Sequence, residues 1–153
     1  MLKSISNDLM HLLNMIEAIS KINMYSKDCV TAEAFYDLNE QLNYNAVLNL
    51  LTHIGETTTK ISDQLRQMYS KVGWQTIKDL RNRISHDYVG IDVAIIFRII
   101  QNEIPILERQ LFQIISEQVG NGSFNRDEYE LAKKSSFYKQ INFGWVKIVN
   151  LKV

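Results

Sequence analysis

Hydrophobic residues recur at alternating intervals of three and four along most of the first 119 positions, which is the spacing of amphipathic helices. Four long stripes and one short stripe can be traced. Short connections between long amphipathic helices favour antiparallel neighbours, so the pattern predicts an all-α, up-and-down bundle of four main helices plus a short one. The stripes are Ile5, Leu9, Leu12, Ile16 and Ile19; Phe35 and Leu38; Val47, Leu50, Ile54, Ile61, Leu65 and Met68; Ile77, Leu80 and Ile84; and Val93, Ile96, Ile100, Ile104, Leu107, Leu111 and Ile114.

Cap-forming residues set the expected helix ends. Asp28 and Thr31 are both candidate N-caps for the short helix, and Asp92 is the expected N-cap of the last long helix. Gly90 lies where a left-handed residue ends the preceding helix. The stripe from Val47 to Met68 predicts one uninterrupted helix, which the region of Gly73 ends.

Pro105 is the only proline and falls inside the pattern of the last long helix. Proline removes one backbone hydrogen bond and clashes with the preceding turn. We therefore expect a kink near residues 101–104.

The chain changes character after position 119. A Gly-Asn-Gly break is followed by a short predicted helix from Asp127 to Lys134 and by "WVKIVNLKV", whose alternation indicates a strand. This divides the chain into a bundle (1–119) and a C-terminal extension of unknown role (120–153). Six aromatic residues of the extension either anchor it to the bundle or to a partner, which we favour, or form an arm that contacts RNA through stacking and cations. They are Phe124, Tyr129, Phe137, Tyr138, Phe143 and Trp145.

Composition limits the classes of protein. The 153 residues, 46% hydrophobic and 22% charged, are typical of one soluble globular bundle, and no apolar run approaches the roughly 20 residues of a membrane-spanning helix. The single cysteine, Cys29, cannot form an internal disulfide, and with no signal peptide apparent we expect a cytoplasmic protein. The 17 basic and 17 acidic residues balance, but the stretch from Lys71 to His86 carries four cations and one anion. Such a local excess can hold an anionic ligand.

The stretch "RNRISHDY", from Arg81 to Tyr88, suits phosphate chemistry. Arginine can hold two phosphate oxygens, and histidine gives and takes a proton near neutral pH. An attack by an RNA 2′-hydroxyl on the adjacent phosphate needs those two services and no metal. The alternative is structural, because the helix dipole favours arginine and histidine at helix C-termini.

Helix geometry adds a condition to this hypothesis. On one ideal helix Arg81 and His86 are about 140° apart and do not converge closely. They share a cleft if the helix loosens before Gly90 or if a second subunit packs along this face. The same projection places a polar and aromatic ridge beside the buried stripe, formed by Trp74, Lys78, Arg81, Ser85 and Tyr88.

Other reactive residues give weaker signals. His53, one turn before Glu56, is expected to be a partly buried structural histidine, since a metal site needs more ligands. Cys29 has no partner that would make it a nucleophile. No Gly-rich phosphate loop is present. We therefore expect neither a metal nor a cofactor.

The motif and its surroundings resemble a known family. Arg81, four residues, His86, one residue and Tyr88 match the pattern of the HEPN superfamily, and the polar Asn82 is also typical. "NLLTHIGE" at 49–56, "GWQTIKDLRNRISHDYVGID" at 73–92 and "NEIPILERQL" at 102–111 resemble landmarks of its HepT (DUF86) branch, in order. The similarity covers roughly residues 5–119. The aromatic extension departs from the family, which commonly ends soon after the last helix.

The resemblance implies a HEPN-like homodimer with two motifs facing a shared cleft. It further implies a metal-independent endoribonuclease, the toxin of a type VII-like toxin–antitoxin pair. Its partners would be an RNA substrate and a MntA-like nucleotidyltransferase antitoxin, which silences the toxin by transferring AMP to a tyrosine. The alternative is a non-catalytic HEPN module that only binds the nucleotidyltransferase.

Residue roles follow from the same resemblance. Arg81 would stabilise the scissile phosphate, His86 would be the general acid or base, and Tyr88 would accept AMP. Further expected contributors are Asn82 and Ser85, which support the site, and Lys78 and Arg83, which are candidates for RNA binding.

Overall fold

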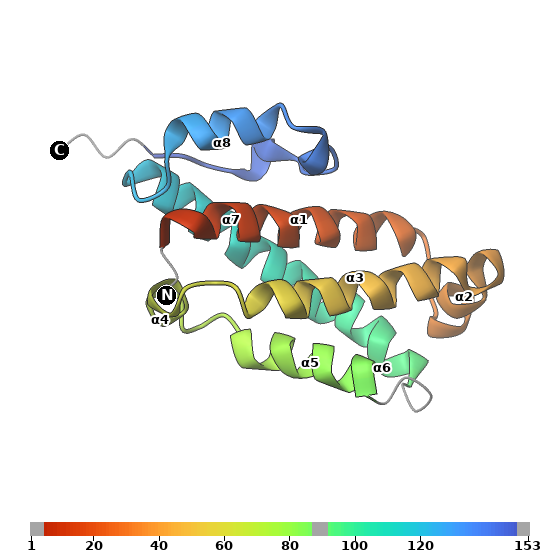
Figure 1. Ribbon diagram of the computed structural model, residues 1–153. Coiled ribbons are helices and arrows are strands. Elements are labelled where there is room, and N and C mark those ends of the chain that lie inside the picture. Colours follow the sequence, from red (N-terminus) through yellow and green to blue (C-terminus); the bar gives the residue numbers. More distant parts are fainter. Residues whose placement is uncertain (1–4, 87–91, 150–153) are drawn as a thin grey trace.

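The computed structural model describes residues 5–86 and 92–149, and all regular structure within these ranges is helical. This confirms the predicted all-α bundle (Figure 1). The α-helices are α1 (Asp8–Tyr25), α2 (Ala32–Asp37), α3 (Leu42–Thr58), α4 (Asp63–Met68), α5 (Trp74–His86), α6 (Val93–Arg98), α7 (Ile104–Gly120) and α8 (Arg126–Lys133). The tighter or wider turns are η1 (Ile5–Asn7), η2 (Leu38–Gln41), η4 (Ile99–Glu103), η5 (Ser136–Tyr138) and η6 (Phe143–Trp145).

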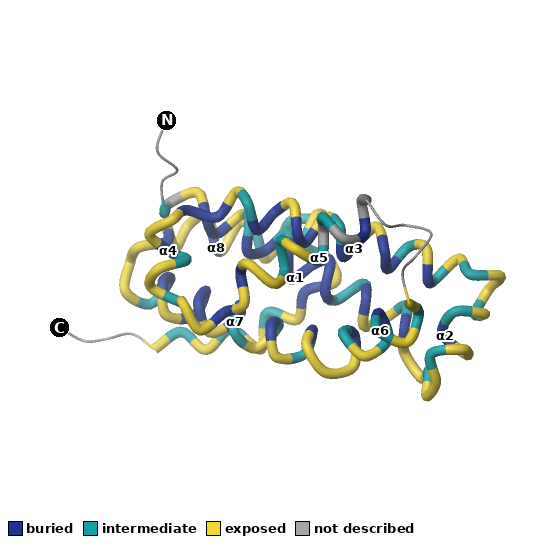
Figure 2. The backbone as a smooth tube through the Cα atoms, turned by 90° about the horizontal axis from the view of Figure 1, so that it is seen from below, coloured by how far each residue is buried: buried dark blue, intermediate teal, exposed yellow. Residues whose placement is uncertain are grey.

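Helix α3 lies in the middle of the bundle, packed against α1 on one side and α5 on the other (Figure 1). Helix α7 crosses behind them and packs on α1. The buried residues face inward along each long helix (Figure 2), and Leu12, Ile16, Ile54 and Leu111 are among the most deeply buried. Full burial of one such side chain is worth about 1.5–3 kcal/mol, so the predicted stripes are the main source of stability.

The prediction of one helix from Val47 to Met68 was wrong. Helix α3 ends at Thr58, and the chain turns before Ser62 starts α4 as its N-cap, with the Ser62 hydroxyl accepting from the Leu65 N–H. The buried carboxylate of Asp8 accepts hydrogen bonds from both the N–H and the hydroxyl of Ser62. A partner 54 residues away in sequence therefore fixes this break.

The irregularity expected before Pro105 is present. The helix that begins at Val93 widens into the π-helical turn η4 and continues as α7, with Pro105 in its first turn. The wide turn accommodates a proline that cannot donate to the residue four positions earlier.

The short helix α2 begins where one of the two candidate caps predicts. Thr31 accepts from the Ala34 N–H. Asp28 is not a cap, because its backbone is left-handed at φ 64° within the turn before Thr31. After α2, Asn39, Glu40 and Gln41 are all left-handed, with φ of 50°, 57° and 72°.

The extension packs on the bundle. Helix α8 forms as predicted, whereas the described part of "WVKIVNLKV" is a 3-10 turn followed by irregular chain and not a strand. Phe124 and Tyr129 are buried. The Gln140 N–H donates to Glu17 of α1 at 2.9 Å, and the Lys147 N–H donates to the Ser116 hydroxyl of α7 at 2.9 Å. The backbone donors of the last segment are thus used by the bundle, so they do not pair with another strand.

Candidate active site on helix α5

Helix α5 carries the motif, and its first turn is fixed by Trp74. This side chain is only 8% exposed, and its indole N–H donates to the Tyr69 carbonyl at 3.1 Å. The expectation that Trp74 lies on a ridge outside the core was wrong. Because the ring needs both an apolar surrounding and a partner for its N–H, it sets the position of α5 against the end of α4.

The next turns of α5 alternate between the core and the solvent. Ile84 is buried, and Ile77 and Leu80 are half-buried and pack on the core. Gln75 and Asp79 are exposed, and the Gln75 amide donates to the Asp79 carboxylate at 2.8 Å. The stripe predicted for this helix is therefore the one that faces α3.

The structure places some of the predicted site residues. Lys78 and Asn82 are both half-buried on α5. The side chains of four further site residues, and the whole of Tyr88 and Gly90, lie outside the described residues. The four are Arg81, Arg83, Ser85 and His86, whose backbone forms the last two turns of α5.

The chain on the far side of the motif is well anchored. Asp92 caps α6 as predicted, its carboxylate accepting from the Ala94 N–H at 2.8 Å. Phe97 of α6 stacks at a tilt on Phe35 of α2, with ring centroids 6.0 Å apart. The motif therefore sits between two helices that are each held by the core.

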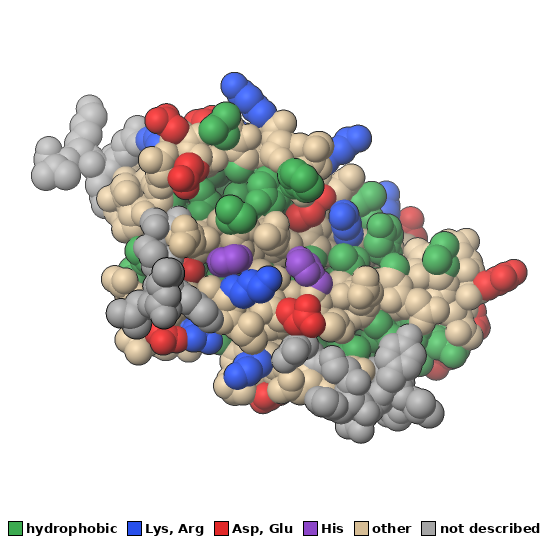
Figure 3. Space-filling model, in the orientation of Figure 1, with side chains coloured by type: hydrophobic (Ala, Val, Ile, Leu, Met, Phe, Trp, Pro, Cys, Tyr) green, Lys and Arg blue, Asp and Glu red, His purple; other side chains and the backbone are tan. Residues whose placement is uncertain are grey.

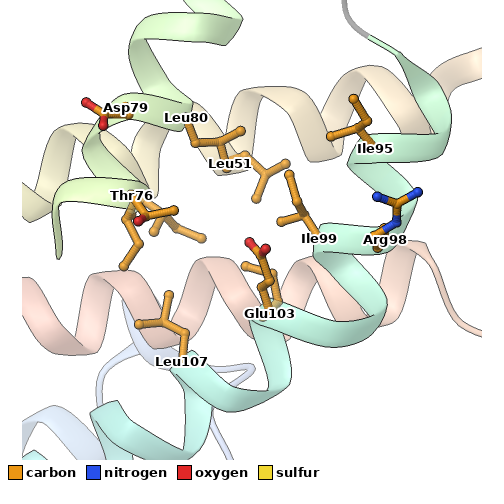
Figure 4. A pocket seen from close by; sticks show the side chains of 12 residues that line it. Leu51, Thr76, Asp79, Leu80, Ile95, Arg98, Ile99, Glu103 and Leu107 are labelled. Atoms are coloured by element: carbon orange, nitrogen blue, oxygen red, sulfur yellow. The ribbon is translucent and has the colours of Figure 1, made fainter. Parts of the chain in front are cut away.

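A cavity of about 310 Å³ opens beside α5, and sequence reasoning did not foresee it (Figure 4). Its floor is apolar, with Leu51 from α3, Leu80 from α5 and Leu107 from α7. Its rim is polar, with Thr76 and Asp79 on α5, Arg98 on α6 and Glu103 on η4. The two carboxylates and one guanidinium give the rim no excess of positive charge. The cavity suits an apolar group better than a phosphate.

The other candidates have ordinary surroundings. His53 is exposed on α3, so the expectation of a partly buried histidine was wrong. Cys29 is half-buried. Within the described ranges no three or more His, Cys, Asp or Glu side chains are grouped as metal ligands would be. Of the helices in those ranges, none is long and apolar enough to cross a membrane.

Titratable groups outside the motif respond to burial. Burial, and then a hydrogen bond to Glu117, raises the pKa of Tyr69 to about 12. Burial also raises the pKa of Asp8, against the lowering effect of its two hydrogen bonds from Ser62. Both groups lie at the end of the bundle opposite the last turn of α5 (Figure 1). They act on stability and not on chemistry at the motif.

Known proteins match the bundle and reach beyond it. Residues 15–114 match the model of a family described as Ribonuclease HepT-like. A Methanocaldococcus jannaschii protein named as a gamma-glutamylcyclotransferase and proposed RNase is 27% identical over 135 residues, which are 86% of this chain and 60% of its own length. A proposed RNase of Caldanaerobacter subterraneus is 34% identical over 73 residues, covering 48% of this chain and 65% of its own length.

A third relative is covered more fully. The probable ribonuclease HepT of Thermococcus cleftensis is 24% identical over 98 residues, which are 64% of this chain and 86% of that protein. The chain thus spans less than two thirds of the first two relatives. No solved structure matches at comparable significance.

Proposed function

Because the chain belongs to the HepT-like ribonuclease family, we propose that it is a metal-independent endoribonuclease whose active residues lie on the last turns of α5. One observation carries the proposal. The Arg81, His86 and Tyr88 motif occurs at the end of a bundle helix inside the segment that matches the family.

The proposed reaction is an internal transfer. The ribose 2′-oxygen attacks the adjacent phosphorus, the bond from phosphorus to the 5′-oxygen breaks, and a 2′,3′-cyclic phosphate and a 5′-hydroxyl result. His86 exchanges the protons, since a base must take the 2′ proton and an acid must supply one to the leaving oxygen. Arg81 stabilises the charge on the phosphate oxygens.

A second copy of the chain completes the site in this proposal. The angle of about 140° between Arg81 and His86 on an ideal helix keeps one copy from focusing both groups on one phosphate. Two motifs that face each other across a dimer cleft remove that difficulty. The other contributors are Asn82 and Ser85, which support the site, and Lys78 and Arg83, which contact RNA.

Control by a nucleotidyltransferase antitoxin is the second part of the proposal. AMP on Tyr88 would bring a phosphodiester charge and a bulky group two residues from His86. The charge would compete with RNA for the same cations, and the bulk would block the cleft. The chain is then the toxin of a type VII-like pair.

Cleavage of a labelled RNA in EDTA tests the proposed activity. We expect His86→Ala to lower the rate by about 10²–10⁴-fold, the usual contribution of a general acid or base. His53→Ala is the matched control, because His53 is an exposed histidine on a neighbouring helix and should cleave like the wild type. Equal cleavage by His86→Ala and wild type would overturn the assignment.

Expression with and without the neighbouring gene tests the antitoxin. We expect slow growth and degraded RNA when the wild type is expressed alone, rescue by a nucleotidyltransferase gene beside it, and one AMP per chain by intact mass, absent in Tyr88→Phe. If AMP is added but wild type and His86→Ala leave RNA equally intact, the chain is a non-catalytic module that binds the nucleotidyltransferase.

A further inference from the structure

The extension after α7 divides its aromatic residues into two groups. Phe124 and Tyr129 are buried and hold the extension on the bundle. Phe137 and Trp145 are 82% and 64% exposed. An anchor explains the first pair and leaves the second unexplained, since exposed aromatic rings do not stabilise a folded chain.

The two exposed rings occur in the same local arrangement. Phe137 is followed by Tyr138 and Lys139, and Trp145 is followed by Val146 and Lys147. In each triplet the middle residue is partly buried against the core, while the aromatic residue and the lysine are exposed. Each triplet therefore presents a ring and an ammonium group together at the surface.

The bundle holds both triplets in place. Turn η5, which contains Phe137, contacts α1, and the Gln140 N–H is bonded to Glu17. Phe143 packs edge-on against Tyr129 of α8, with ring centroids 6.0 Å apart, which positions the turn that carries Trp145. The Lys147 N–H is bonded to Ser116. The exposed rings thus project from an anchored backbone.

Gly120 permits this anchoring at the end of α7. A Cβ on Gly120 would lie 3.0 Å from the Val149 carbonyl oxygen, so the last described segment lies directly on the helix backbone.

The charge of this surface favours an anionic partner. Residues 131–149 include four lysines and no acidic residue, and the acids of the extension are confined to positions 127–130. Lys133 is paired with Glu130 at 3.5 Å and lies over the Tyr129 ring, so Lys139 and Lys147 are the cations that count here. On the face in Figure 3, hydrophobic side chains gather where α8 lies beside α1, with charged groups at their border.

We infer that the two triplets, Phe137–Lys139 and Trp145–Lys147, form a docking surface for single-stranded RNA. Aromatic rings stack on bases of any sequence, and lysines beside them contact the phosphates, which is how proteins hold single strands without sequence preference. The inference rests on the proposed RNA substrate. Helix α8 lies on the side of the bundle away from α5 (Figure 1), so the surface acts on affinity and not on the cleavage step.

Anisotropy of a fluorescein-labelled, unstructured 12-nucleotide RNA tests the inference without cleavage. The full chain with His86→Ala is the background, and Phe137→Ala with Trp145→Ala is the test variant. We expect binding to weaken by about 10-fold or more, with substantial recovery in Phe137→Ala alone with Trp145→Phe, which restores one ring. Leu131→Ala, an equally exposed non-aromatic residue of α8, should bind like the background. Lys139→Ala with Lys147→Ala should lower the salt dependence by roughly one unit of slope.

Two readouts separate this inference from the proposed activity. In a chain with His86 intact, the double aromatic variant should raise KM about 10-fold and leave kcat unchanged, given the stacking contribution of each ring. Unchanged RNA affinity in that variant overturns the docking surface even where cleavage is normal. Loss of binding to the nucleotidyltransferase with unchanged RNA affinity overturns it too, in favour of a protein partner. If His86→Ala cleaves normally but the aromatic variant binds RNA poorly, only the proposed activity fails.

Discussion

The two ends of the bundle are held by different interactions. At one end α1 begins, α7 ends and α4 lies between them (Figure 1). There, buried polar contacts join distant segments: Asp8 accepts from Ser62, and Gln118 donates to the Tyr69 hydroxyl at 2.8 Å. Such contacts are directional, so they fix how the segments meet.

At the other end, where α5 finishes with the motif, aromatic rings fill the space. Phe35 lies edge-on to Tyr44 at 6.1 Å and tilted against Phe97 at 6.0 Å, and Tyr36 lies edge-on to Tyr44 at 4.9 Å. The same end contains three consecutive left-handed residues, 39–41. Left-handed backbone in residues other than glycine costs about 1–2 kcal/mol each. The difference shows that the end with the motif carries stored strain, whereas the opposite end carries specific buried bonds.

The largest expected effect concerns the polar end, where the extension joins the bundle. Phe124 is fully buried beside the end of α7, and its N–H donates to the Gln118 carbonyl at 2.8 Å. We expect Phe124→Ala to lower the free energy of unfolding by about 3–5 kcal/mol, measured by urea denaturation. The exposed Phe137→Ala is the control and should change it by less than about 0.5 kcal/mol.

The same experiment can contradict the picture of one folded unit. If Phe124→Ala leaves the main urea transition unchanged and only makes the extension sensitive to protease, the extension folds separately. The polar end would then be complete without it.

The second effect concerns the carboxylate that joins α1 to α4. Asp8→Ala leaves the buried N–H and hydroxyl of Ser62 without their acceptor. We expect a loss of about 1–3 kcal/mol in the free energy of unfolding at neutral pH. The exposed Asp63→Ala, one residue from Ser62, is the control and should cost less.

The pH dependence of Asp8 has a defined sign. Burial raises its pKa above the ordinary 3.8, so over the interval between 3.8 and the raised value the folded state binds more protons than the unfolded state. Stability contributed by this group therefore falls as pH rises through that interval. The difference in unfolding free energy between wild type and Asp8→Ala should become larger as pH is lowered through it, and a difference that shrinks would contradict the raised pKa.

The sequence predicts the bundle well because the helical stripes are local. It does not predict the break after Thr58, since Ile61 and Leu65 keep the helical period and are both buried. The deciding interaction is the bond from Ser62 to Asp8, which depends on tertiary packing. Pro105 is a local signal, and the irregular turn before it was foreseen.

The site was predictable only in part. The motif and the helix that carries it follow from local pattern and resemblance. The cavity beside α5 does not, because it arises where the π-helical turn η4 stands away from α5 and α3, with Glu103 and Arg98 at the rim. The burial of Trp74 was missed for a similar reason, since its partner is the Tyr69 carbonyl at the end of another helix.

The smallest expected effect tests the strain at the motif end. Glu40 is exposed and left-handed, at φ 57° and ψ 41°. Glycine adopts this backbone without a steric cost but loses more entropy on folding, so Glu40→Gly should raise the free energy of unfolding by about 0.5–1 kcal/mol. Ala34→Gly on α2, at the same end of the bundle and with ordinary helical backbone, should lower it by about 0.5–1 kcal/mol. Opposite shifts of the urea midpoint in the two variants would locate the strain in the backbone of residues 39–41. A loss in both would mean that the turn is not strained, and the contrast between the two ends would then rest on the aromatic cluster alone.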